Sequence, residues 1–182
     1  MSRSKILFSL TGSIACYKAC QLISRLAQDG CEVKAVCTPA ALQFIGLSTL
    51  EGLTRQPVYA DMFESKTALD HVELARWADL SIICPASANT INKLAAGIAD
   101  NAVTALFLAY DLSKPCLIAP AMNQAMYAHP ATRRALATLK SWKVSVLGVD
   151  TGRQACGDIG EGRLLDPEKI CGSIRRALQR RP

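Results

Sequence analysis

Short apolar runs alternate along the chain with longer segments in which apolar residues return every three or four positions. The runs are typical of strands buried on both faces, and the spaced segments are typical of helices packed against them. The alternation predicts an α/β fold with a parallel sheet and helices on both faces. Strands are predicted at 5–10, 32–38, 79–84, 115–119 and 144–149, with an extended piece near 57–60. Helices are predicted at 15–26, 40–53, 89–99, 102–109, 123–142 with an interruption at Pro130, and 167–179.

The predicted elements fit one domain. The chain has 182 residues, a usual length for a single compact domain with a substantial core. Half of the residues are hydrophobic and only 5% are aromatic, so the core is expected to be aliphatic. We therefore expect a single Rossmann-like (flavodoxin-like) domain over residues 1–182.

Charge and hydropathy narrow the classes of partner. The net charge is +6, but part of it lies in the predicted last helix without interleaved aromatic residues, which favours a solvated tail over a nucleic-acid surface. A basic surface also suits a small anionic substrate. The longest apolar runs, 80–84 and 116–122, are far shorter than the ~20 residues of a membrane span, and residues 1–13 do not read as a signal peptide. We expect no nucleic acid, no membrane and a cytoplasmic location.

The eight cysteines are expected to be reduced thiols. Cys37, Cys84 and Cys116 lie inside apolar runs, where cysteine packs as a small hydrophobic residue. The chain has no C-x-x-C pair, and its two histidines, His71 and His129, stand alone. We therefore expect no metal site.

Three predicted strands end in turns of small and polar residues, at 11–13, 85–90 and 120–123. The carboxyl ends of parallel strands share one edge of the sheet, where helix N-termini present free N–H groups to anions. The turns are therefore expected to converge on one phosphate-bearing ligand. Ser13, Ser87 and Asn89 each fit a helix cap as well, and it is their joint placement at strand ends that favours a binding site.

Several common nucleotide and hydrolase motifs are missing. No G-x-G-x-x-G follows the first predicted strand, so the dinucleotide fingerprint is absent. Neither G-x-x-x-x-G-K-[ST] nor G-x-S-x-G occurs, which excludes the commonest phosphate-transfer and hydrolase sites. The glycine-rich segment 157–162 is predicted to be a flexible loop that can close over a site.

Two of the strand ends carry recognisable motifs. Residues 85–90 read Pro-Ala-Ser-Ala-Asn-Thr, and residues 120–126 read Pro-Ala-Met-Asn-Gln-Ala-Met. Together they resemble the PASANT and PxMNxxM motifs of the homo-oligomeric flavin-containing cysteine decarboxylases. Residues 70–79 resemble the histidine segment of that family, and residues 155–162 resemble the substrate-recognition flap of its coenzyme A branch. The resemblance extends from about residue 5 to 165, with one departure at Tyr127, where the family usually has tryptophan.

The resemblance implies an FMN enzyme that acts on 4′-phosphopantothenoylcysteine. Such an enzyme oxidises the cysteine side chain, releases carbon dioxide and reduces the product to 4′-phosphopantetheine, in coenzyme A synthesis. The residues implied to hold FMN are Gly12, Ser13, Ile14, Thr38, Phe44, Ser87, Ala88, Asn89, Thr90 and Ala121. The residues implied to hold substrate are Asn123, Arg153, Ala155 and Leu164.

Three residues are implied to be catalytic: His71, Asn123 and Cys156. His71 would act as a base or steer the substrate carboxylate, although a lone histidine is otherwise more often structural. Asn123 would anchor the carboxylate or amide of the substrate, and at the start of a predicted helix it also fits a cap. Cys156 lies outside the apolar runs and would donate a proton when the enethiol intermediate is reduced.

The same flap separates the branches of the family. Peptidyl-cysteine decarboxylases stop at the enethiol and resemble residues 155–162 poorly, so Cys156 favours the coenzyme A branch. A peptidyl-cysteine decarboxylase of peptide maturation and a non-catalytic flavin-binding regulatory subunit remain alternatives. A flavin prenyltransferase shares the fold but lacks both motifs.

The resemblance also implies partners. The family forms homo-oligomers, so we expect a trimer, or a dodecamer built from trimers, in which a neighbouring subunit completes the pocket. The aliphatic segment 102–109 is a candidate contact surface, although a core position explains such a stripe as well. In many bacteria the domain is fused to phosphopantothenoylcysteine synthetase, which is therefore a candidate partner.

Overall fold

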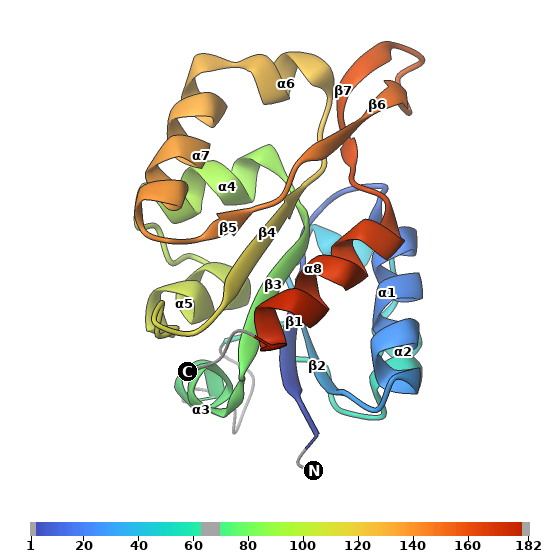
Figure 1. The fold of residues 1–182 in the computed structure, drawn as a ribbon, viewed down its shortest axis with the longest axis vertical. Helices are drawn as coiled ribbons and strands as arrows, with labels where there is room; N and C mark the ends of the chain where they lie inside the picture. Colours follow the sequence, from blue (N-terminus) through green and yellow to red (C-terminus); the bar gives the residue numbers. More distant parts are fainter. Residues whose placement is uncertain (1–2, 63–69, 180–182) are drawn as a thin grey trace.

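The chain folds around a five-stranded parallel sheet (Figure 1). The structure is a computed structural model that describes residues 3–62 and 70–179. The strands are β1 (Lys5–Leu10), β2 (Glu32–Cys37), β3 (Leu80–Ala86), β4 (Cys116–Pro120) and β5 (Ser145–Val146), in the order β2-β1-β3-β4-β5. The predicted α/β, Rossmann-like fold is thereby confirmed.

Helices cover both faces of the sheet (Figure 1). They are α1 (Cys16–Gln28), the 3₁₀ turn η1 (Ala41–Gln43), α2 (Leu47–Thr54), α3 (Asp70–Trp77), α4 (Ala88–Ala95), α5 (Ala102–Ala109), α6 (Gln124–Ala128), α7 (Pro130–Ser141) and α8 (Pro167–Gln179). Helices α1, α2 and α8 pack on one face, and α3, α4, α5 and α7 pack on the other. Within the described residues, no helix is both long enough and apolar enough to span a membrane.

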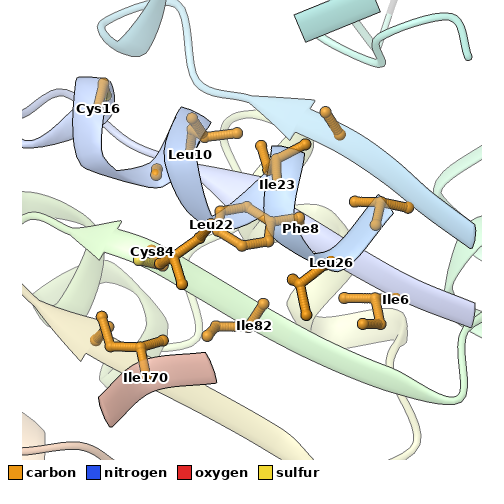
Figure 2. Close-up of a cluster of buried hydrophobic side chains, with 14 of the residues drawn as sticks. Ile6, Phe8, Leu10, Cys16, Leu22, Ile23, Leu26, Ile82, Cys84 and Ile170 are labelled. Atoms are coloured by element: carbon orange, nitrogen blue, oxygen red, sulfur yellow. The ribbon is translucent and has the colours of Figure 1, made fainter. Parts of the chain in front are cut away.

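Alternating side chains of β1 build both layers of the core. Ile6 and Phe8 join the cluster under α1, whereas Leu7 between them joins the cluster on the opposite face. Figure 2 shows the first cluster, in which Leu22 and Ile23 of α1 meet the sheet. Burying each such side chain contributes about 1.5–3 kcal/mol, so the central strands are held firmly on both sides.

The segment predicted to be a flexible loop is instead part of a hairpin. Strand β6 (Val149–Arg153) pairs antiparallel with β7 (Ile159–Leu164), and Gly152 lies opposite Gly160. The predicted fifth strand 144–149 is shorter in the structure: β5 contains only two residues, and residue 149 belongs to β6. The loop interpretation of 157–162 was wrong because β7 turns glycines toward its packed side, where a strand usually shows apolar residues.

Other boundaries differ in detail. The predicted helix 40–53 is divided into η1 and α2, and the predicted helix 89–99 ends at Ala95. Helix α3 follows a segment outside the described residues and was not predicted as a helix. The interruption at Pro130 is confirmed, because Pro130 is the first residue of α7 and the His129 side chain caps that helix.

A buried hydroxyl joins the ends of two central strands. Thr11 Oγ1 donates a hydrogen bond to the carbonyl of Pro85 over 2.7 Å and accepts one from the N–H of Ser87 over 2.8 Å. Thr11 is completely buried, so both bonds are shielded from water. The turns after β1 and β3 are therefore held in a fixed relation to each other.

Candidate functional site

A cavity of about 660 Å³ lies outside the carboxyl ends of β1, β3 and β4. Its walls are the turns that follow these three strands, the first turn of α1 and the β6–β7 hairpin. The lining residues are 12–15, Tyr17, Lys18, 87–88, 121–123, Met126, 153–156 and 162–164. The predicted convergence of three strand ends on one site is thus present in the cavity wall.

Two parts of the wall offer backbone N–H groups. The amides of Gly12, Ser13 and Ile14 have no acceptor among the described residues. The first-turn amides of α4 cannot bond within the helix, and Ser87 caps only that of Thr90, which donates to Ser87 Oγ over 3.4 Å. Free donors at a helix N-terminus attract anions, so this side of the cavity suits a phosphate.

The charged side chains of the wall are basic. Lys18, Arg153 and Arg163 line the cavity, and no aspartate or glutamate is found among the lining residues of the described chain. The Arg163 guanidinium lies directly against Gly152, in space that a side chain at that position would fill. The expected small anionic ligand is consistent with this charge.

On the other side of the cavity, Asn123 contacts Cys156. Asn123 is the N-cap of α6, and its Oδ1 accepts the N–H of Ala125 over 2.7 Å. Its Nδ2 donates to Cys156 Sγ over 3.3 Å and to Gln154 Oε1 over 3.2 Å. The exposed Cys156 thiol in turn donates to Asp158 Oδ2 over 3.4 Å. A carboxamide and a thiol from distant segments therefore meet at one point of the wall.

Comparison with known proteins decides the family. A profile of the family described as Flavoprotein matches residues 1–179. The chain belongs to the Flavoprotein family. It is 42% identical over 176 residues to the probable phosphopantothenoylcysteine decarboxylase of Streptococcus mutans. The match covers 96% of this chain and 98% of that protein.

Two further matches extend the comparison. The chain is 42% identical over 172 residues to the coenzyme A biosynthesis bifunctional protein CoaBC of Bacillus subtilis. That match covers 93% of this chain but 42% of the bifunctional protein, so the chain spans less than half the length of that relative. A solved cysteine-to-serine mutant of PPC decarboxylase, complexed with pantothenoylaminoethenethiol, matches with a TM-score of 0.85 and 31% identity, over 98% of this chain and 100% of that one.

Most of the predicted site residues of this Flavoprotein chain lie in the cavity wall. Of those expected to hold the cofactor, the wall contains Gly12, Ser13, Ile14, Ser87, Ala88 and Ala121. It contains all those expected to hold substrate, namely Asn123, Arg153, Ala155 and Leu164, together with the catalytic candidate Cys156. The hairpin brings residues 153–156 and 162–164 to the three strand ends.

Five predicted residues do not line the cavity of the single chain: Thr38, Phe44, His71, Asn89 and Thr90. Thr38 and Thr90 are buried, and their hydroxyls bond within the chain, Thr38 to the amide of Ala41 and Thr90 to Ser87. The side chain of Phe44 is 48% exposed on the turn after β2. His71 is on α3, and its Nδ1 is buried without a partner in the described part of the chain. The roles of these five residues, like those of the predicted residues in the cavity wall, remain predictions.

Several lining residues were not predicted, notably Tyr17, Lys18, Gln154 and Arg163. Tyr17 and Lys18 lie one helical turn after Ser13 and Ile14, so helical spacing from those residues could have indicated them. Gln154 and Arg163 reach the cavity only because β6 and β7 form a hairpin. No local pattern in the sequence indicates that contact.

Cys156 differs from the other cysteines. All eight are free thiols, as expected, and Cys156 is the exposed one. Burial raises the pKa of Cys16 to about 11 and that of Cys37 to about 12, so both stay protonated at neutral pH.

In the described residues, no group of three His, Cys, Asp or Glu side chains is placed to hold a metal ion.

The hairpin docks through a close backbone approach at Gly162. The amide of Met122 donates to the carbonyl of Gly162 over 2.8 Å. Gly162 has φ +118°, and a β-carbon there would lie 2.5 Å from the Met122 carbonyl oxygen. Only glycine combines this backbone conformation with this contact.

We expect Gly162→Ala to lower the free energy of unfolding by about 2–3 kcal/mol, because it adds a steric clash to the cost of a left-handed residue. Gly157→Ala is the matched control, since Gly157 has φ +96° but open space around it, and it should cost about 1 kcal/mol. Urea unfolding of both variants checks this. Equal losses in the two variants would show that the approach to Met122 is not tight.

Proposed function

We propose that the chain catalyses the FMN-dependent decarboxylation of 4′-phosphopantothenoylcysteine to 4′-phosphopantetheine in coenzyme A synthesis. One observation carries the proposal: Asn123 and the Cys156 thiol touch in the wall of a cavity whose other side offers free amides. The similarity to a probable phosphopantothenoylcysteine decarboxylase along almost the whole of both chains supports it.

The residues present fit FMN. Gly12, Ser13 and Ile14 would bind its phosphate through their unpaired amides, with Ser87 and Ala88 at the start of α4. Ile14 and Met126, which are 60% and 48% exposed, offer apolar surface to the flavin ring. FMN is preferred over FAD because no dinucleotide fingerprint is present. Bound FMN supplies a reversible two-electron acceptor beside the substrate.

The chain's own residues orient the substrate and move protons. Oxidation of the carbon that bears sulfur gives a thioaldehyde, loss of carbon dioxide leaves an enethiol, and reduction of the enethiol gives the thiol product. Asn123 anchors the polar end of the cysteine unit, and Arg153 adds positive charge to an anionic ligand. Cys156 Sγ gives its proton to the substrate carbon when the enethiol is reduced. Asp158 accepts the S–H hydrogen bond beforehand and thereby orients the thiol.

We propose that the working protein is a homo-oligomer, a trimer or a dodecamer built from trimers. The cavity of one chain lacks His71, so a neighbouring copy would supply this residue. Exposed apolar side chains around the turns after β1 and β2, at Ile14, Tyr17, Phe44 and Leu47, support a contact there. Helix α5 is a poor contact surface, because most of it is buried in the chain's own core.

The synthetase remains a proposed partner. It is suggested by the bifunctional protein of Bacillus subtilis, of which this chain matches less than half. A cytoplasmic location likewise remains a prediction.

Two measurements test the proposed function. Flavin released by heating should be FMN, in about one equivalent per chain if every cavity is filled. The holoenzyme should release carbon dioxide from 4′-phosphopantothenoylcysteine and not from a peptide that ends in cysteine. FAD in place of FMN, or a preference for the peptide, would contradict the proposed activity. Bound FMN with no release of carbon dioxide from either substrate would favour a regulatory subunit.

A further inference from the structure

We propose that Gln154 is a positioning residue that sets the orientation of the Asn123 carboxamide and holds it against the Cys156 thiol. The inference deepens the proposed function and rests on it. Gln154 thereby keeps the substrate anchor, Asn123 at the start of α6, in contact with the proton donor, Cys156 in the hairpin.

Backbone groups fix the Gln154 side chain. Its Nε2 donates to the carbonyl of Glu161 over 2.8 Å, and its Oε1 accepts the N–H of Gln124 over 3.1 Å. Turning the amide over would place NH₂ against an N–H and oxygen against a carbonyl, so both bonds would be lost. The side chain therefore has one orientation, set by β7 on one side and α6 on the other.

The fixed Gln154 oxygen and the capping bond from Ala125 together determine the orientation of the Asn123 carboxamide. Gln154 Oε1 accepts from Asn123 Nδ2 over 3.2 Å, while Asn123 Oδ1 accepts the N–H of Ala125 over 2.7 Å. The reversed carboxamide would set two oxygens against each other at Gln154. With Nδ2 held on this side, it reaches Cys156 Sγ at 3.3 Å. Without Gln154, only the capping bond to Ala125 and the weak contact to sulfur would hold the carboxamide.

The hairpin leaves room for this arrangement. Gln154 is half-buried, and a β-carbon on Gly162 would lie 3.4 Å from its Nε2. The same glycine bonds to Met122, the residue before Asn123. Strand β7 therefore carries both a backbone contact and the carbonyl of Glu161 that orients Gln154.

Gln154→Met tests the inference, because it keeps the length of the side chain and removes both polar atoms. We expect unchanged FMN content and about tenfold slower carbon dioxide release in a single turnover, the effect of one lost orienting hydrogen bond. The fraction of product that leaves as enethiol should rise, because Cys156 is no longer held beside Asn123. Gln154→Glu keeps an acceptor for Asn123 but sets an oxygen against the Glu161 carbonyl, so it should recover only part of the rate.

Gln124→Ala is the matched control. Gln124 lies against Gly160 in the same contact between hairpin and helix, but its side chain is outside the cavity wall. This variant should decarboxylate at the unmutated rate. In flavin-free protein, hydrogen exchange at the amides of residues 124 and 125 should accelerate in Gln154→Met and stay unchanged in Gln124→Ala, which gives a readout without catalysis.

A double variant separates positioning from an independent role. If Gln154 acts through Asn123, the pair Gln154→Met with Asn123→Ala should be no slower than Asn123→Ala alone. Multiplied losses, or a Gln154→Met variant that matches the unmutated enzyme, would overturn the inference and leave the proposed function intact. An unmutated holoenzyme that releases no carbon dioxide would instead contradict the proposed function itself.

Discussion

Cys156→Ser is expected to decarboxylate a first equivalent of substrate and then stall with an enethiol product. The thiol is exposed, lies in the cavity wall and contacts Asn123, as a proton donor for the second half of the reaction requires. A serine hydroxyl is a far weaker acid than a thiol, so it should not replace the donor. Mass spectrometry of the product, together with the carbon dioxide released per chain, measures the stall.

Cys31→Ser is the control for this prediction. Cys31 is half-buried outside the cavity wall and should tolerate the exchange without loss of either half-reaction. If Cys156→Ser formed 4′-phosphopantetheine at the unmutated rate, Cys156 would not be the donor. The main reason for preferring the coenzyme A branch to the peptide branch would then be lost.

His71→Asn should keep FMN and lose carbon dioxide release by a factor on the order of 10² or more, the usual contribution of a positioned acid or base. The cavity of one chain does not include His71, so the residue is expected to act on a neighbouring copy. Two strongly impaired variants, one lacking His71 and one lacking Asn123, should therefore complement each other. Co-expression of His71→Asn with Asn123→Ala in equal amounts should restore about a quarter of the unmutated activity, because one site in four then receives both intact residues.

Each variant expressed alone should stay strongly impaired, and light scattering should report a trimer or a multiple of trimers. If co-expression restores nothing although the chains mix, His71 works on its own chain or has a structural role. A monomer that holds FMN tightly would contradict the shared site more directly.

The strand ends could be predicted from the sequence because each depends on local signals. Gly12, Ser87 and Asn123 follow apolar runs, and parallel strands bring such ends to one edge whatever the rest of the chain does. The β6–β7 hairpin could not be predicted in this way. The packed positions of β7 are Gly160, Gly162 and Leu164, so two of the three places that would show an apolar alternation are glycines.

The resemblance indicated Arg153, Ala155, Cys156 and Leu164 of the hairpin, but two further lining residues were missed for the same reason. Gln154 and Arg163 have no local feature that separates them from other polar residues, and they become important only through contacts with α6 and Gly152. Thr38 and Thr90 are a different case. Their hydroxyls complete a turn and a cap within the chain, and their role at the cofactor remains a prediction.

The most direct test of the account is the complete reaction of the FMN-loaded protein with 4′-phosphopantothenoylcysteine under anaerobic conditions, with no added oxidant or reductant. Oxidation and reduction of the substrate balance in the proposed sequence, so the protein should turn over many times. It should yield one carbon dioxide and one 4′-phosphopantetheine for each substrate consumed. A reaction that needs an external oxidant, or that accumulates the enethiol in place of 4′-phosphopantetheine, would contradict the proposed function.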